Sequence, residues 1–121
     1  MFADTDFILA LIKESDWLKT NAEKILEDNK GNIRTSISVM IELAHVCKRH
    51  KINILEMFAH VFEIIEVNEE AYSVCMKAGF YIEKYDSSVF DAFHAAFCGN
   101  DQIISSDLIY DKIGLERISL K

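Results

Sequence analysis

The segment FDAFHAAFCGNDQIISSD (residues 90–107) leads from an apolar helix, through a glycine, into an apolar strand. Phenylalanine and alanine recur in its first half at helical spacing, and Gly99 is expected to end that helix. The second half is a short apolar run, which predicts a strand that ends at Asp107. The helix is expected to pack through a stripe of three phenylalanines: Phe90, Phe93 and Phe97. A helix followed directly by a strand is the unit from which α/β sheets are built.

The same alternation continues along the rest of the chain, which has 121 residues and no proline. Apolar periodicity predicts helices over residues 6–12, 16–32, 37–50, 53–62, 68–85, 87–99 and 108–114. Short apolar or β-branched runs predict strands at residues 2–4, 32–36, 63–67, 102–107 and 115–120. Because no linker or repeat divides the chain, we expect one domain over residues 1–121. This order predicts an α/β fold with a parallel sheet, right-handed crossovers and helices on both faces.

Several helix ends carry local signals. Gly31 is expected to be the left-handed cap that closes helix 16–32. Asn53 and Glu56 stand at capping-box spacing, and Asn68 is predicted to cap the helix that follows it. Helix 37–50 is expected to pack through one apolar stripe: Met40, Leu43, Ala44 and Cys47.

The net charge of −7, from 20 acids against 13 lysines and arginines, limits the function classes. It argues against a protein that grips nucleic acid by broad electrostatic attraction. It leaves room for a protein that meets phosphate through bound cations, since a metal ion reverses the local sign of an acidic cleft.

No stretch reaches the ~18 uncharged apolar residues that span a membrane. The nearest, NILEMFAHVFEIIEV, is broken by Glu56, Glu63 and Glu66, and no secretory signal is visible, so we expect no membrane association. Three widely spaced cysteines indicate neither a disulfide framework nor a thiolate zinc site, and each is expected to be a small buried hydrophobe: Cys47, Cys75 and Cys98. A reducing cytoplasm is the expected compartment.

Two aspartates follow predicted strands. Asp4 ends the first strand, and Asp107 ends the strand of residues 102–107. In parallel sheets the ligand crevice lies beyond the carboxyl ends of the strands, which gives a geometric reason to consider the two together. Each could instead cap the helix that follows. Asp6 competes with Asp4 for that role because it lies closer to the periodic run, and Ser105 and Ser106 compete with Asp107.

Two further acids lie early in apolar helices. Glu42 is in a helix that is apolar around most of its circumference, so little of that helix is expected to face water. Asp91 is on a helix rich in phenylalanine and alanine, where a charge costs desolvation free energy unless it has a partner. A solvated glutamate and a first-turn aspartate favoured by the helix dipole are the alternatives.

If the four acids converge, they need a counter-charge. Two carboxylates ~6 Å apart repel by about 3 kcal/mol at an effective dielectric constant of ~20. Six such pairs amount to roughly 10 kcal/mol or more, which is comparable to the stability of a small domain. Such a cluster holds either protons or a divalent cation, and oxygen ligands favour Mg²⁺ or Mn²⁺ over zinc. Hard cations on carboxylates are the usual apparatus for hydrolysing phosphodiesters.

Four motifs in this order resemble the PIN domain family over essentially the whole chain. DTDFILALI resembles the family's opening Asp-Thr/Ser, and TSISVMIELAHV its Ser/Thr-rich strand end followed by a helical glutamate. FDAFHAAFCGNDQIISSD resembles the third and fourth motifs, and LIYDKIGLERI continues in the family manner.

The resemblance implies a three-layer α/β/α sandwich and a metal-dependent ribonuclease that hydrolyses RNA. It implies that Asp4, Glu42, Asp91 and Asp107 are the catalytic, metal-binding acids. It implies that Thr5 and Ser105 supply supporting hydroxyls, whereas Asp6 stands where the family often has asparagine. The chain looks most like the VapC toxins, which dimerise and are held inactive by a small antitoxin protein.

The basic run KRHK is the expected contact for the RNA backbone, through Lys48, Arg49 and Lys51. A helix C-terminus that complements the dipole is the alternative. His94 could reach the site, although a place on the helix surface is favoured. An Asp-x-Asp phosphatase and a response-regulator receiver lack their partner motifs here. A catalytically silent domain that binds a protein partner through its acidic cleft stays open.

Overall fold

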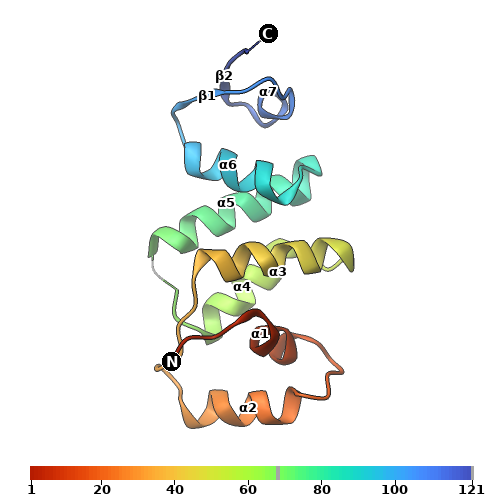
Figure 1. Cartoon of the computed structure of the whole chain (residues 1–121), viewed down its shortest axis with the longest axis vertical. Helices are drawn as coiled ribbons and strands as arrows, with labels where there is room; N and C mark the ends of the chain where they lie inside the picture. Colours follow the sequence, from red (N-terminus) through yellow and green to blue (C-terminus); the bar gives the residue numbers. More distant parts are fainter. Residues whose placement is uncertain (68, 121) are drawn as a thin grey trace.

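The structure, a computed structural model, describes residues 1–67 and 69–120 (Figure 1). The helices are α1 Thr5–Ile12, α2 Lys19–Asp28, α3 Ile37–Arg49, α4 Ile54–Ile64, α5 Glu69–Tyr85, α6 Val89–Cys98 and α7 Ile109–Ile113. The strands are β1 Gln102–Ile104 and β2 Glu116–Ile118. Apolar periodicity therefore predicted every helix in the described ranges, with differences confined to the ends.

The helix ends show which local signals were decisive. The Asn53 side chain accepts a hydrogen bond from the Glu56 amide at 2.8 Å, which confirms the predicted N-cap of α4. Gly99, at φ +62°, is the C-cap of α6, as expected. Gly31 was wrongly predicted as the cap of α2: this helix stops at Asp28 with Asn29 as its C-cap, although Gly31 does have a positive φ. The predicted cap Asn68 lies outside the described residues.

Helix α2 also begins later than predicted, at Lys19 instead of residue 16. The Asp16 carboxylate accepts a hydrogen bond from the Leu18 amide at 2.9 Å. This local bond offers the backbone a turn as an alternative to the first helical residues.

The predicted strands form two separate parallel groups. In the first, Phe2 bridges Arg34, and Arg34 bridges Glu66. The buried Thr35 hydroxyl strengthens this group by donating a 2.9 Å hydrogen bond to the Ala3 carbonyl. In the second, β1 and β2 pair in parallel, with Gln102 opposite Glu116 and Ile104 opposite Ile118. The parallel direction is confirmed, but all five strands were predicted too long. The first three are single bridges, β1 ends at Ile104 and not at Asp107, and β2 covers only Glu116–Ile118.

The two groups lie apart. In Figure 1, β1, β2 and α7 occupy one end of the molecule beyond α6, whereas α1 and α2 lie toward the other end. Within residues 1–67 and 69–120, the bridged segments pair only with one another, and the sheet has the order β1-β2. The protein is thus helix-rich, and the continuous sheet of a three-layer sandwich is not seen in the part of the chain described.

The core lies between the central helices. All four residues of the stripe predicted on α3 are buried: Met40, Leu43, Ala44 and Cys47. Phe58 of α4 meets Phe93 of α6 edge to face, with ring centroids 6.2 Å apart. A side chain on Gly79 of α5 would lie 3.3 Å from Leu55 and Phe58, so this glycine allows α4 and α5 to approach closely.

The predicted phenylalanine stripe on α6 is wrong for two of its three members. Phe93 is buried, whereas Phe90 is 54% exposed and Phe97 is 53% exposed. The buried face consists instead of Phe93 with small or β-branched neighbours: Val89, Ala92, Ala95 and Ala96. Because α6 packs on α5 and α3 through the alanines, its outer phenylalanines remain in solvent.

Two of the three cysteines are buried, as predicted, and Cys98 is partly exposed. Burial raises the pKa of Cys47 to about 11 and that of Cys75 to about 12, so neither thiol is a nucleophile at neutral pH. None of the helices in the described residues is long and apolar enough to span a membrane.

Candidate active site

Asp4 lies directly after the bridged residues at the chain's start and is the N-cap of α1. One of its carboxylate oxygens accepts a hydrogen bond from the Thr5 amide at 2.7 Å. Asp6 lies within the first turn of the helix, so its predicted competition for the cap is wrong. Asp4 is exposed, and a carboxylate has about four acceptor positions, so capping leaves oxygen lone pairs for a cation.

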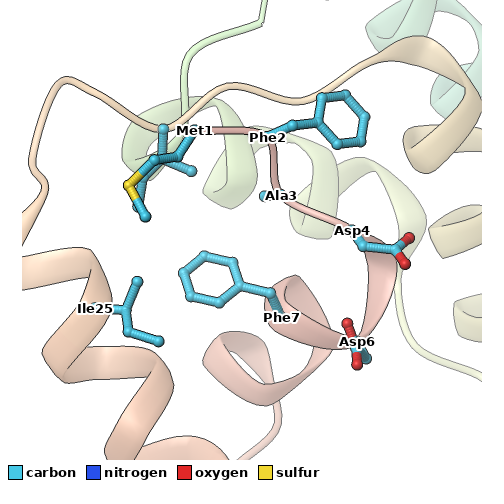
Figure 2. Close-up of a pocket in the computed structure, with 8 residues that line it drawn as sticks. Met1, Phe2, Ala3, Asp4, Asp6, Phe7 and Ile25 are labelled. Atoms are coloured by element: carbon cyan, nitrogen blue, oxygen red, sulfur yellow. The ribbon is translucent and has the colours of Figure 1, made fainter.

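The Asp4 and Asp6 carboxylates point away from the apolar pocket beside them. Figure 2 shows Met1, Phe7 and Ile25 facing this pocket while both carboxylates are turned outward. The pocket has a volume of about 250 Å³. The charges therefore face solvent, where another acidic element or an ion can approach them.

Asp91 lies in the first turn of α6, where the Ser88 hydroxyl accepts a 3.2 Å hydrogen bond from its backbone amide. One oxygen of its carboxylate accepts a hydrogen bond from the Tyr110 hydroxyl at 3.2 Å. The Asp91 carboxylate thus has a hydrogen-bond partner, a buried phenol on α7, and it also occupies the first turn as the dipole alternative predicted.

Two of the predicted acids, Asp91 and Asp107, lie near the same residue, Tyr110. Burial, which is the largest cause, raises the pKa of Tyr110 to about 12 together with the negative charge and hydrogen bond of Asp91 and the charge of Asp107. The sequence signal for this tyrosine was its place three residues after Asp107, within LIYDKIG. Sequence reasoning noted the aromatic residue without giving it a role at the site.

Asp107 is held by a short turn between β1 and α7. The Ser105 hydroxyl accepts a 3.0 Å hydrogen bond from the Asp107 amide and so holds the backbone of this turn. The Asp107 carboxylate accepts a 2.9 Å hydrogen bond from the Ile109 amide and so caps the following turn. As with Asp4, capping occupies one acceptor position and leaves others free.

Arg117, on β2, fixes the same turn and was missed by sequence reasoning. Its guanidinium donates to both carboxylate oxygens of Asp111 at 3.0 and 2.9 Å, and to the Ser105 carbonyl at 2.9 Å. The hydrogen bond from Arg117 lowers the pKa of Asp111, and the same bond raises the pKa of Arg117. A bidentate arginine gives the turn geometric definition that a lysine would not.

Glu42 is exposed on α3, so the prediction that little of this helix faces water is wrong for this residue. One turn later, the His45 ring lies 5.0 Å from the Phe90 ring of α6, centroid to centroid. Glu42 and Asp91 therefore come from two helices that pack together.

Thr5, next to Asp4, has a buried hydroxyl group that lacks a hydrogen-bond partner among the described residues. Its side chain is 5% exposed. Buried hydroxyls are normally satisfied, so an orphan directly after Asp4 indicates a place for a water or ligand atom.

The structure does not gather the four acids into one cluster. No three histidine, cysteine, aspartate or glutamate side chains in residues 1–67 and 69–120 lie close enough together to hold a metal ion. Asp91 and Asp107 act on the same phenol, whereas Asp4 is on α1 and Glu42 is on α3. The separation follows from the two strand groups, because Asp4 and Asp107 come shortly after segments that do not pair with each other.

The predicted RNA-contacting run lies at the C-terminus of α3 beside the start of α6. Lys48 donates a 2.6 Å hydrogen bond to the Ser87 carbonyl and lies 3.6 Å from an Asp86 carboxylate oxygen. Arg49 and Lys51 are exposed. Lys48 and Arg49 are also in the last turn of the helix, where cations complement the dipole, so the alternative is confirmed without excluding a phosphate contact.

The family model for the PIN domain matches residues 1–114. The chain belongs to the PIN domain family. PIN domains are α/β proteins, generally nucleases, and typically use divalent metal ions. No curated protein matches the chain. All four predicted acids of this PIN domain lie within the matched range.

The pH dependence of the free energy of unfolding is expected to reveal the interaction between Tyr110 and Asp91. A phenol titrates near pH 10 when unfolded but at about 12 here, so the unfolded chain loses this proton first. The contribution of the raised Tyr110 pKa to the free energy of unfolding is complete below pH 10, and it is lost as the pH rises through about 12. Urea unfolding at pH 9 and at pH 11.5 measures this loss. Between the two pH values, the free energy of unfolding should fall more in the wild type than in Tyr110→Phe. An equal loss in both proteins would contradict the assignment.

Proposed function

We propose that this PIN domain is a metal-dependent endoribonuclease that hydrolyses RNA phosphodiester bonds. The observation that carries the proposal is membership of the PIN domain family over residues 1–114. The chemistry of the candidate residues supports it, since all of them offer hard oxygen atoms and Mg²⁺ and Mn²⁺ prefer such ligands. The unpartnered Thr5 hydroxyl beside Asp4 fits the same purpose.

We assign Asp4, Asp91 and Asp107 as the residues that would hold Mg²⁺ or Mn²⁺, with Glu42 contributing directly or through water. When bound, the ion would supply an activated water and offset negative charge at the phosphate. This assignment requires the ends of residues 2–4 and of β1 to meet, as they would in a three-layer α/β/α sandwich. The parallel direction of both strand groups is compatible with one sheet.

The protein's own contribution is to orient these carboxylates. Tyr110 donates to one oxygen of Asp91 and leaves the other free. Ser105 and Arg117 fix the turn that carries Asp107. Ligands held by neighbouring hydrogen bonds lose less conformational freedom when an ion binds, and such supporting contacts commonly raise metal affinity.

We further propose that the protein is a cytoplasmic toxin of the VapC-like group, a homodimer inhibited by a small antitoxin protein. The support is the resemblance of the four motifs, from DTDFILALI to FDAFHAAFCGNDQIISSD, with LIYDKIGLERI continuing in the family manner. A catalytically silent PIN domain that binds a protein partner through its acidic surface is the second candidate. The observation in its favour is that the four acids are not clustered in the described residues.

Metal removal distinguishes the two candidates. End-labelled single-stranded RNA, incubated with the purified protein, should be cut in the presence of Mg²⁺ or Mn²⁺ and left intact when EDTA is added. The expected ratio of rates is a hundredfold or more, because the ion supplies several kcal/mol of transition-state stabilisation. RNA that stays intact with either ion, in a protein shown by circular dichroism to be folded, would favour the silent domain.

A further inference from the structure

Phe90 is an exposed aromatic side chain beside a proposed ligand. It is 54% exposed and directly precedes Asp91, one of the proposed metal ligands. Phe93 of the same helix is buried, so the exposure of Phe90 does not come from a lack of core positions on α6. The position of this exposed ring, next to a proposed metal ligand, offers a surface on which a substrate can stack.

The Phe90 ring is held by two histidines from two helices. It stacks on the His94 ring, one turn further along α6, with centroids 6.3 Å apart and an angle of 28° between the planes. The His45 ring of α3 lies 5.0 Å away at 54°. His94 is exposed, whereas the Nε2 atom of His45 is buried and has no hydrogen-bond partner in the part of the chain described. The ring is thus supported from α3 while about half of it stays open.

Two cationic residues of α3, Lys48 and Arg49, lie one helical turn after His45, which contacts the Phe90 ring. Lys48 and Arg49 follow His45 by three and four residues, which places them along the same side of α3. Lys48 is also bonded to the Ser87 carbonyl, three residues before Phe90. The neighbourhood therefore combines an open aromatic ring, cationic side chains and, at the next residue, a carboxylate.

We propose that Phe90, supported by His45 and stacked with His94, is the platform on which an unpaired base of single-stranded RNA stacks beside Asp91. This inference rests on the proposed ribonuclease function and adds how the substrate is held. Proteins commonly bind unpaired bases by stacking them on aromatic side chains, while cations contact the backbone. With a net charge of −7, the protein cannot rely on broad attraction, so stacking would supply much of the affinity.

The surroundings of Phe90 favour a nucleobase over a protein partner. A docked protein would need a continuous apolar patch, whereas the ring stacked on Phe90 is the exposed, polar His94, and Ser88, two residues before Phe90, is also exposed. A single ring among polar groups suits a flat, polar-edged ligand such as a base.

The test compares three variants. Phe90→Ala removes the platform, and Phe90→Trp restores a stacking surface. Phe97→Ala is the matched control, because Phe97 is also about half exposed, at 53%, but lies near the other end of α6. Each is made in the Asp107→Asn background, so that bound RNA is not consumed. Affinity is measured by the fluorescence of a single-stranded RNA that carries 2-aminopurine, in the presence of Mn²⁺.

Phe90→Ala should bind the RNA about tenfold more weakly or worse, since stacking one base on an aromatic ring gives an effect of this size. Phe90→Trp and Phe97→Ala should stay within about twofold of the background protein. In the wild-type background, Phe90→Ala should raise KM and leave kcat nearly unchanged. Equal losses in both alanine variants, or none, would overturn the proposal.

Two outcomes distinguish the base-stacking role of Phe90 from a protein interface and from the ribonuclease proposal. If Phe90→Ala converts a dimer to a monomer and leaves RNA affinity intact, the ring belongs to a protein interface and the platform is wrong. If the wild type binds RNA through Phe90 but never cuts it, the platform stands and the ribonuclease proposal falls. A protein that binds no RNA at all overturns both.

Discussion

Replacing Asp91 by asparagine is expected to lower kcat/KM for RNA cleavage by about a hundredfold or more, with the fold unchanged. The substitution keeps the shape of the side chain and removes the charge that would hold a divalent ion, which is worth several kcal/mol in the transition state. The Tyr110 hydroxyl can still donate to the amide oxygen, so the packing of α6 against α7 should survive. Gel analysis of labelled RNA with Mn²⁺ measures the loss.

Asp28→Asn is the matched control for that experiment. Asp28 is an exposed acid at the end of α2, outside the proposed ligand set, and its replacement should leave the rate within twofold. Asp4→Asn makes the same test at the N-cap of α1, since asparagine caps a helix as well as aspartate does. Cleavage by folded Asp91→Asn at the wild-type rate would remove Asp91 from the proposed site.

Phe58→Ala is expected to lower the free energy of unfolding by roughly 3–5 kcal/mol, the usual cost of removing a buried phenylalanine. Phe58 is fully buried on α4 and packs edge to face on Phe93, and its ring also closes the space above Gly79. The change opens a cavity where α4, α5 and α6 meet. Urea unfolding followed by circular dichroism at pH 7 gives the value.

Trp17→Ala serves as the comparison for the core variant, because Trp17 is also a large aromatic residue but is 90% exposed. Its loss should change the free energy of unfolding by no more than about 0.5 kcal/mol. If Phe58→Ala costs less than about 1.5 kcal/mol, the site collapses around the missing ring and the core is less tightly packed than the contacts indicate.

The helices could be predicted from the sequence because their signals are local. The stripe of Met40, Leu43 and Cys47 recurs at helical spacing, and the Asn53 cap acts within three residues of its partner. Strand lengths could not be predicted in this way. Whether residues 2–4 extend as a strand depends on the neighbours that pair with them, and these lie far along the chain.

The candidate residues of the site could be chosen from the sequence for the same reason, and their role stays a prediction. Strand-end and first-turn positions singled out Asp4, Asp91 and Asp107, and the structure joins the last two through Tyr110. The tyrosine's role depends on α7 packing against α6, which no local pattern encodes. Phe90 was assigned to the core because its spacing fits a stripe, but the alanines on α6 set the buried face elsewhere.

The family match ends at residue 114, yet the guanidinium that holds the Asp107 turn belongs to Arg117. A shortened chain that stops at the matched boundary would keep every proposed ligand and lose the group that keeps one of them in place. If Asp107 is a ligand as proposed, the segment beyond residue 114 contributes to the site by holding the Ser105 carbonyl through Arg117.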